Sequence, residues 1–242
     1  GQPRMLRGRV LPHVAEATAR DDTATRPRSA ADTSRRRGLA SDVMNDWGKV
    51  YADCVEETAR LAASLNDEDL VRRVPATPEW TVRDVLCHAA GAPADALAGR
   101  MDGAPSPAWT GRQVTEREDC SVADLIIELR GTVPGIVATL ADAERPAIVW
   151  DKAVHLADLY EALGQGVSPE HTWRAVLDNV GPWRLADLPL TIRCGTTTYG
   201  AGGPEVEASA YELFRAAFSR RTAAEMRAWV GDTVSDDQLD AI

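Results

Sequence analysis

The chain has 242 residues, a length that suits one larger domain or one domain with a small partner. Hydrophobic residues make up 44% and charged residues 26%, as in ordinary globular proteins, and no apolar run approaches the ~18 residues that a membrane span needs. The net charge of −10 argues against nucleic acid as the main partner, because phosphate binding needs clustered Lys and Arg. We therefore expect neither a membrane protein nor a nucleic-acid binder.

The four cysteines are scattered, without a CxxC motif or any close pair: Cys54, Cys87, Cys120 and Cys194. Such a pattern is neither a disulfide framework nor a four-cysteine zinc site. It suits a reducing compartment, and we expect a cytoplasmic protein.

The charge is unevenly distributed along the chain. Residues 1–40 contain nine Arg and four acidic residues, and they lack a helical period. The apolar stretch from Val10 to Ala17 is interrupted by Pro12 and His13, so it does not read as a secretory signal. We predict that residues 1–43 are a disordered basic tail or an upstream extension, with Met44 as the natural beginning; a tail that contacts an acidic partner is the alternative.

Between residues 44 and 165, apolar residues recur at three- and four-residue steps in four segments, which predicts four amphipathic helices. The second and third helices begin at capping-box sequences, Thr81–Asp84 and Ser121–Asp124. The expected helices cover 46–65, 81 to about 91–93, 121–140 with a kink at Gly131 and Pro134, and 146–164. A turn with Pro75 and Pro78 and a loop over 99–111 separate them. Four such helices predict a helical bundle.

The pattern changes after residue 165. We expect a short helix from Ser168 to Val180, a strand from Leu188 to Cys194 that continues into a hairpin through Gly203, and two helices over 208–219 and 223–230. Residues 166–242 are therefore predicted to form a small α+β domain. The fold class is mainly α.

The fourth helix contains a cluster of ionisable residues. Asp151, His155 and Asp158 stand at positions i, i+4 and i+7, so both Asp lie within about 60° of His155 around the helix. This arc also contains apolar residues, and ionisable groups among core positions need a partner or a metal. Two interpretations stay open. One is a His–Asp pair that hydrogen-bonds across helices; the other is a divalent-metal site with Asp151 and His155 as ligands, and with Asp158 supporting a ligand or facing the substrate.

A metal site needs a third ligand, and the remaining imidazoles are His88, His13 and His171. His13 lies in the basic tail, and His171 opens a helix of the second domain. His88 lies on the second helix of the bundle, where facing helices can direct side chains to one point. Cys87 points about 100° away from His88, so packing is its expected role.

The segment ATPEWTVRDVLCH, which ends at His88, resembles the signature GWTVRDLLAHL of mycothiol-dependent maleylpyruvate isomerase-like proteins, within the DinB-like metal-binding superfamily. The family's second signature is a carboxylate, three residues, a His, two residues and an Asp, and Asp151 to Asp158 follow it. A weaker match covers Tyr211–Thr222. The resemblance extends over about residues 46–232.

This resemblance implies a DinB-like four-helix bundle that holds one divalent metal, usually zinc, and a small C-terminal domain. The family's ligands correspond to His88, His155 and Asp151, where most relatives have Glu in place of Asp151. The implied activity is mycothiol-dependent thiol transfer or isomerisation.

With such a metal, a bound thiol would lose its proton and add to an electrophilic carbon. Arg220 or Arg221 would hold a carboxylate of the substrate or thiol, or else form a solvated basic patch. Asp158 would orient a ligand or accept a proton, and Trp80 is expected to close the end of the bundle as core rather than to stack on substrate. The expected partners are a small-molecule electrophile and a low-molecular-weight thiol, and the protein is expected to be a monomer or homodimer. The alternatives are a metal-dependent hydrolase or other enzyme on the same site, and a non-catalytic metal-binding or regulatory protein.

Overall fold

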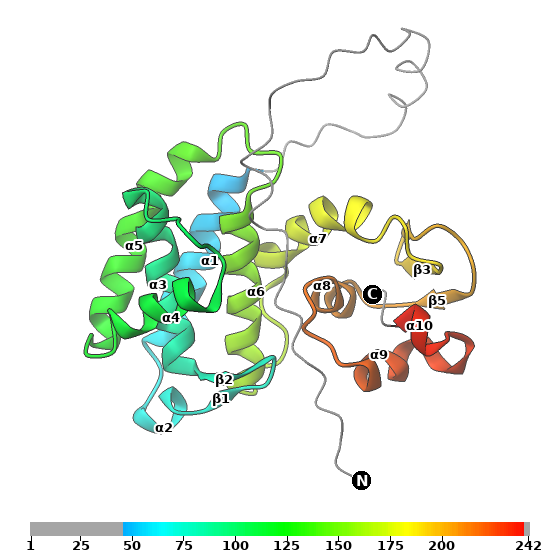
Figure 1. The fold of residues 1–242 in the computed structure, drawn as a ribbon, viewed down its shortest axis with the longest axis horizontal. Coiled ribbons are helices and arrows are strands. Elements are labelled where there is room, and N and C mark those ends of the chain that lie inside the picture. Colours follow the sequence, from blue (N-terminus) through cyan, green and yellow to red (C-terminus); the bar gives the residue numbers. More distant parts are fainter. Residues whose placement is uncertain (1–45, 240–242) are drawn as a thin grey trace, which may run out of the picture.

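Four long helices form the first half of the described chain, and Figure 1 labels each of them. The structure is a computed structural model that describes residues 46–239, so the tail predicted over 1–43 lies outside the described residues. The four helices are α1 (Trp47–Ala62), α3 (Val82–Ala98), α5 (Val122–Thr139) and α6 (Ala147–Ala162). Helix α1 packs against α5 and α6, and α3 packs against the same two helices, so the four close into a bundle. The predicted helical bundle is confirmed.

The capping boxes predicted from the sequence start their helices as expected. The Thr81 side chain accepts a hydrogen bond from the Asp84 amide, while Asp84 accepts from the Thr81 amide, and Ser121 and Asp124 do the same for α5. These reciprocal bonds satisfy amides that have no partner inside the helix.

Helix α3 does not end near Gly91 and Pro93, as the sequence predicted, but continues to Ala98. Pro93 lacks the N–H that would bond to the Ala89 carbonyl, and the Lys152 ammonium donates to that carbonyl instead, at 2.6 Å. Gly91 allows Gln113 to pack closely against α3, since a Cβ at Gly91 would lie 2.7 Å from the Cβ of Gln113. The two residues that read as a stop signal are thus explained by tertiary contacts.

Four short elements near the bundle were not predicted as such. The expected turn after α1 contains helix α2 (Asp67–Leu70) and an antiparallel pair of strands, β1 (Arg73–Val74) and β2 (Thr77–Thr81). The expected loop over 99–111 contains the start of helix α4 (Pro107–Thr115), which packs on α3. Ser106 caps α4 and Pro107 occupies its first turn, two helix-start signals that the loop prediction overlooked.

The remaining chain forms a helical layer with a small sheet. Its strands are β3 (Thr191–Cys194), β4 (Thr197–Tyr199) and β5 (Glu205–Glu207), in the order β4-β3-β5. The predicted hairpin is the antiparallel pair β3–β4, while β5 adds a parallel strand that was not predicted. The helices are α7 (Glu170–Arg184), α8 (Ala210–Ala217), α9 (Ala223–Val230) and α10 (Asp236–Leu239), with a 3₁₀ turn at Gly231–Thr233.

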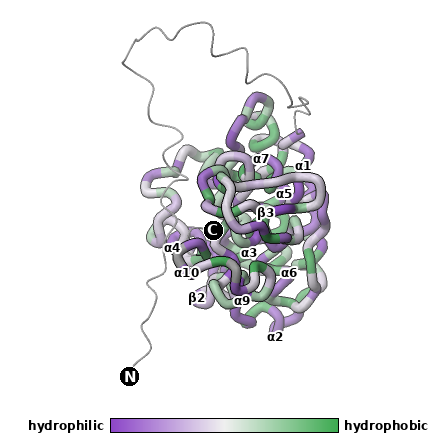
Figure 2. Tube along the Cα trace, turned by 90° about the vertical axis from the view of Figure 1, so that its right-hand side faces the viewer, coloured by the Kyte–Doolittle hydropathy of each residue, from purple (hydrophilic) through white to green (hydrophobic). Residues whose placement is uncertain are grey.

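One hydrophobic core runs through both parts of the molecule. Helix α7 packs on α1 and α6 of the bundle and also on α8. Figure 2 shows hydrophobic and hydrophilic residues alternating along the helices, as amphipathic helices require. The mainly α fold, a bundle followed by a small α+β part, is confirmed, whereas the division at residue 165 stays a prediction. None of the helices within residues 46–239 combines the length and the hydropathy of a membrane-spanning segment.

Candidate metal centre

Three side chains predicted as ligands meet between α3 and α6. His88 projects from α3, and Asp151 and His155 project from successive turns of α6. Asp151 Oδ1 lies 3.2 Å from His88 Nε2 and 3.5 Å from His155 Nε2, and one ligand atom from each residue lies within 4.8 Å of the other two. Two imidazole nitrogens and a carboxylate oxygen so close together match the donor set of a three-ligand zinc site.

The second nitrogen of each histidine contacts an acceptor. His88 Nδ1 lies 2.7 Å from Gln113 Oε1, and His155 Nδ1 lies 3.1 Å from Asp158 Oδ2. Both partners can accept a hydrogen bond from Nδ1, and in that tautomer each Nε2 would offer its lone pair to an ion held beside Asp151 Oδ1. Such hydrogen bonds fix the tautomer and ring orientation of metal-binding histidines.

The orientation of the Gln113 amide is fixed by a buried carboxylate. Gln113 Nε2 donates to Asp95 Oδ2 at 2.7 Å, which leaves Oε1 to face His88. Arg112 and Arg100 both pair with Asp95, which is fully buried. Helix α4 thus orients a candidate ligand on α3, a role for Gln113 that the sequence reading missed.

Burial and neighbouring charges set the protonation of the three candidate ligands. Burial alone would raise the pKa of Asp151, but electrostatic interactions with His88, Lys152 and His155 hold that pKa well below its usual range. Burial lowers the pKa of His155, an effect partly offset by Asp151 and by the hydrogen bond to Asp158. A charged carboxylate beside a neutral imidazole is the state that binds a divalent cation.

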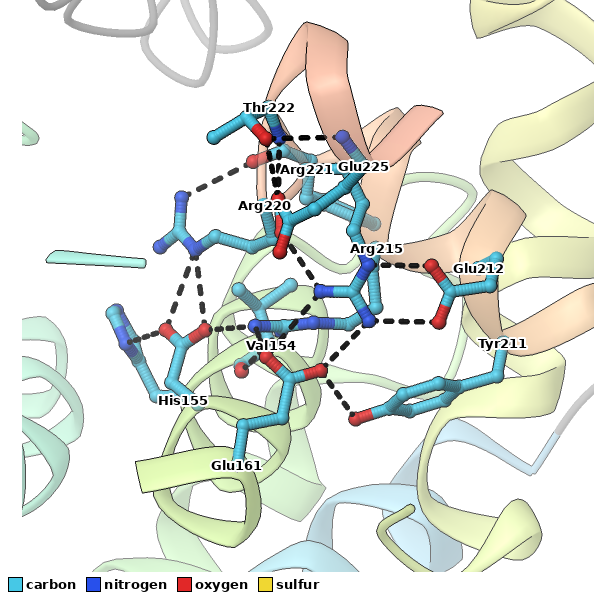
Figure 3. A network of polar contacts seen from close by, with 12 residues as sticks. Val154, His155, Glu161, Tyr211, Glu212, Arg215, Arg220, Arg221, Thr222 and Glu225 are labelled. Carbon is cyan, nitrogen blue, oxygen red and sulfur yellow. Dashed lines mark hydrogen bonds and ion pairs between the residues drawn. The ribbon is translucent and has the colours of Figure 1, made fainter. Parts of the chain in front are cut away.

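Asp158 is fully enclosed and contacts His155 and two arginines, and Figure 3 labels these three partners. Arg215 Nη2 lies 2.5 Å from Asp158 Oδ1, and Arg220 Nε lies 3.3 Å from both carboxylate oxygens. Burial would raise the pKa of Asp158, but Arg220, the His155 hydrogen bond and Arg215 lower it far below its usual range. This geometry suits a residue that orients His155 better than one that faces the substrate or accepts a proton. The fully buried Arg215 was not among the predicted site residues.

The two arginines predicted to hold a substrate carboxylate have different surroundings. Arg221 pairs with Glu212 at 2.5 Å and Glu161 at 2.9 Å, and the hydrogen bonds to Glu212 raise its pKa. Arg220 uses Nε for Asp158 and Nη1 for the Phe218 carbonyl, while its Nη2 has no partner within residues 46–239. The alternative of a solvated basic patch is therefore wrong for both, and of the two arginines Arg220 alone keeps a donor without a partner among the described residues.

Trp80, at the end of β2, lies against both histidines rather than closing the bundle as buried core. Its ring is half-buried, 5.2 Å from the His88 ring centroid and 5.9 Å from that of His155, on which it stacks. Trp80 therefore covers the candidate centre.

The other candidates from the sequence lie away from the cluster. Cys87 is buried and its Sγ contacts the Arg117 carbonyl, as expected of a packing residue. His171 is exposed at the start of α7, and His13 lies outside the described residues.

Helices α1, α3, α5 and α6 thus form a four-helix bundle with a candidate metal centre between two of them. Residues 51–160 match the family model described as the mycothiol maleylpyruvate isomerase N-terminal domain, and the bundle belongs to this family. The expected family, which is named for an enzyme, is confirmed for these residues.

Two solved structures resemble the chain. One is the crystal structure of the mycothiol-dependent maleylpyruvate isomerase, with 13% identity and a TM-score of 0.48. The other is a histidine-to-alanine mutant of that enzyme, with 12% identity and a TM-score of 0.46. Each likeness covers 73% of this chain and 89% of the other. No curated protein matches the chain significantly.

Proposed function

We propose that the chain is a metal-dependent enzyme that activates a low-molecular-weight thiol, mycothiol, for addition to an electrophilic small molecule. The observation that carries the proposal is the convergence of His88 Nε2, His155 Nε2 and Asp151 Oδ1, with each Nδ1 on its own acceptor. Nitrogen and carboxylate donors of this kind favour zinc, and three ligands leave a coordination position open. We take mycothiol as the thiol because it is named in the description of the family to which the bundle belongs.

His88, His155 and Asp151 would hold the ion, which when bound supplies the positive charge that makes a thiol ionise near neutral pH. Gln113 and Asp158 keep the two imidazoles in the ligating orientation. Trp80 shields the centre from water, and Arg220 Nη2, which has no partner among residues 46–239, is suited to a carboxylate of the thiol or its substrate.

The thiolate would form a sulfur–carbon bond with the electrophile. In an isomerisation, rotation follows and the same bond breaks, so the thiol is recovered; in a transfer, the bond persists and the thiol is consumed. All four cysteines are free thiols, which supports the proposed cytoplasmic location.

Metal analysis of the purified protein tests the centre directly. We expect about one zinc ion per chain in the unmodified protein and little in the His155→Ala variant, because two remaining ligands compete poorly with water. His171→Ala removes an exposed histidine and is the matched control. Stoichiometric metal in His155→Ala would contradict the ligand assignment.

The reaction is tested by incubating metal-loaded and chelator-treated protein with mycothiol and a set of electrophiles, maleylpyruvate among them. Mass spectrometry separates thiol adducts from isomerised substrate with unchanged thiol. Turnover that needs both metal and thiol supports the proposal, whereas metal-dependent turnover without thiol would favour a hydrolase.

A further inference from the structure

Two consecutive residues of α3 face two consecutive residues of α6. His88 contacts Asp151, and the next residue, Ala89, accepts a hydrogen bond through its carbonyl from Lys152 Nζ at 2.6 Å. Lys152 is only 1% exposed. Its Nζ also lies 3.5 Å from Asp151 Oδ2, the carboxylate oxygen that does not face the histidines.

The Ala89 carbonyl is available to Lys152 because of a proline. In α3 this carbonyl would accept from the amide four residues later, but that residue is Pro93, which has no N–H. An unpaired carbonyl is costly inside a protein, and so is an unpaired ammonium. Lys152 and Pro93 therefore form a matched pair: the proline leaves an acceptor free, and the lysine uses it.

We propose that Lys152 is a positioning residue for the metal centre, anchored on the carbonyl that Pro93 leaves free and holding Asp151 Oδ2 so that Oδ1 alone faces the two histidines. The proposal rests on the proposed function for its metal measurements. The Ala89 bond fixes where α6 lies along α3, one residue from the His88–Asp151 contact. The contact with Asp151 Oδ2 restrains the carboxylate directly. Because an aspartate side chain has one torsion fewer than a glutamate side chain, this contact leaves the carboxylate little freedom to turn.

A pair of substitutions separates positioning from a purely structural role. Lys152→Met keeps an apolar stem and removes the ammonium, leaving both Ala89 O and Asp151 Oδ2 without their partner. We expect its dissociation constant for Zn²⁺, measured by competition with a chromophoric chelator, to rise about 10- to 100-fold. Adding Pro93→Ala supplies an amide for the Ala89 carbonyl and should raise the melting temperature, but it supplies nothing for Asp151. The double variant should therefore be stable and still bind Zn²⁺ weakly.

Spectroscopy provides a second measurement. The Co²⁺-loaded double variant should differ from the unmodified protein in its visible absorption, because Asp151 is free to present either oxygen. Lys49→Met, which removes an exposed ammonium from α1, is the control for loss of a lysine. Pro134→Ala replaces another helical proline, inside α5, and is the control for Pro93→Ala. Its effect on the melting temperature should be the same with and without Lys152→Met.

Three results would overturn the proposal: Zn²⁺ affinity within twofold of normal in Lys152→Met, affinity that returns with stability in the double variant, or a double variant that does not fold. If Lys152→Met itself does not fold, the double variant decides, and weak Zn²⁺ binding by a folded double variant supports the proposal. Failure of the unmodified protein to bind Zn²⁺ would contradict the proposed function as well, whereas the variant results bear on Lys152 alone.

Discussion

Asp151 is the residue on which the candidate centre depends most, because its Oδ1 lies between the Nε2 atoms of His88 and His155. Asp151→Asn keeps the shape and removes the charge, so we expect Zn²⁺ affinity to fall at least about tenfold and activity to fall with it. Asp151→Glu keeps the carboxylate and its charge and should be tolerated, as the family resemblance implies. Chelator competition measures the affinity, and circular dichroism checks that the bundle is intact.

Two outcomes would change this interpretation. An Asp151→Asn protein with normal metal content and activity would remove Asp151 from the site. Loss of helicity together with the metal would instead indicate a structural metal centre rather than a catalytic one.

Gln113 offers a test of the residues that orient the ligands. Gln113→Leu removes the acceptor of the His88 Nδ1 proton and leaves Asp95 without that amide. We expect about 10- to 100-fold weaker Zn²⁺ binding. Gln165→Leu, at an exposed glutamine, should leave the affinity unchanged. Equal affinities in the two variants would show that His88 does not need Gln113.

The spacing of residues along one helix could be read from the sequence, and contacts between helices could not. Asp151 and His155 share a face of α6 because they are four residues apart, and the family signature ends at His88. Hydrogen bonds to residues 25, 63 and 57 positions away in the sequence give Gln113, Lys152 and Arg215, respectively, their roles. Local periodicity does not predict these contacts. A lysine among apolar residues of a helix has no evident role until its acceptor on another helix is known.

At the scale of elements, α4 and α3 meet closely at Gly91. An added Cβ would lie 2.7 Å from Gln113 Cβ and 2.9 Å from Arg117 Nη1, so Gly91→Ala must push α4 away. We expect a loss of about 1–3 kcal/mol in unfolding free energy from overpacking. Zn²⁺ affinity should fall as well, about tenfold, because Gln113 moves with α4.

The control for this substitution is another helical glycine. A Cβ at Gly131 in α5 meets nothing within 4 Å, so Gly131→Ala should stabilise the protein by about 1 kcal/mol. Urea unfolding and chelator competition on both variants check the contrast. Normal Zn²⁺ affinity in Gly91→Ala would indicate that α4 can shift without disturbing His88.

Element boundaries were predictable where local hydrogen bonds set them. The capping residues Thr81 and Ser121 begin α3 and α5 as the sequence indicated, because each bonds within its own first turn. The predicted end of α3 was wrong because Pro93 is compensated by a side chain from α6. Strand β5 was missed because its hydrogen bonds go to β3, across an irregular connection.

At the scale of the whole molecule, a buried network joins the bundle to the C-terminal part. Arg215 on α8 donates to Asp158 and Glu161 on α6, and also to the Val154 carbonyl at 3.3 Å. Arg220 and Arg221, just after α8, contact the same two carboxylates. Since Asp158 also accepts from His155, the position of the C-terminal part is coupled to the orientation of a candidate metal ligand.

Arg215→Met tests this coupling through its pH dependence. The folded-state pKa of Asp158 is lowered far below its unfolded value, so the carboxylate contributes stability that is complete above an unfolded pKa of about 3.9 and is lost as pH falls toward the folded pKa. Removing one partner of a buried pair should cost about 3–5 kcal/mol near neutral pH. The unfolding free energies of the variant and the unmodified protein should differ by a constant amount from neutral pH down to about pH 4 and converge below it, because Asp158 protonates on approach to its low folded-state pKa and then needs Arg215 less. Arg174→Met, at a half-exposed arginine of α7, should cost at most about 1 kcal/mol. Urea unfolding across this pH range measures both, and a difference for Arg215→Met that stays constant below about pH 4 as well would mean that its contribution comes from packing rather than from the Asp158 charge.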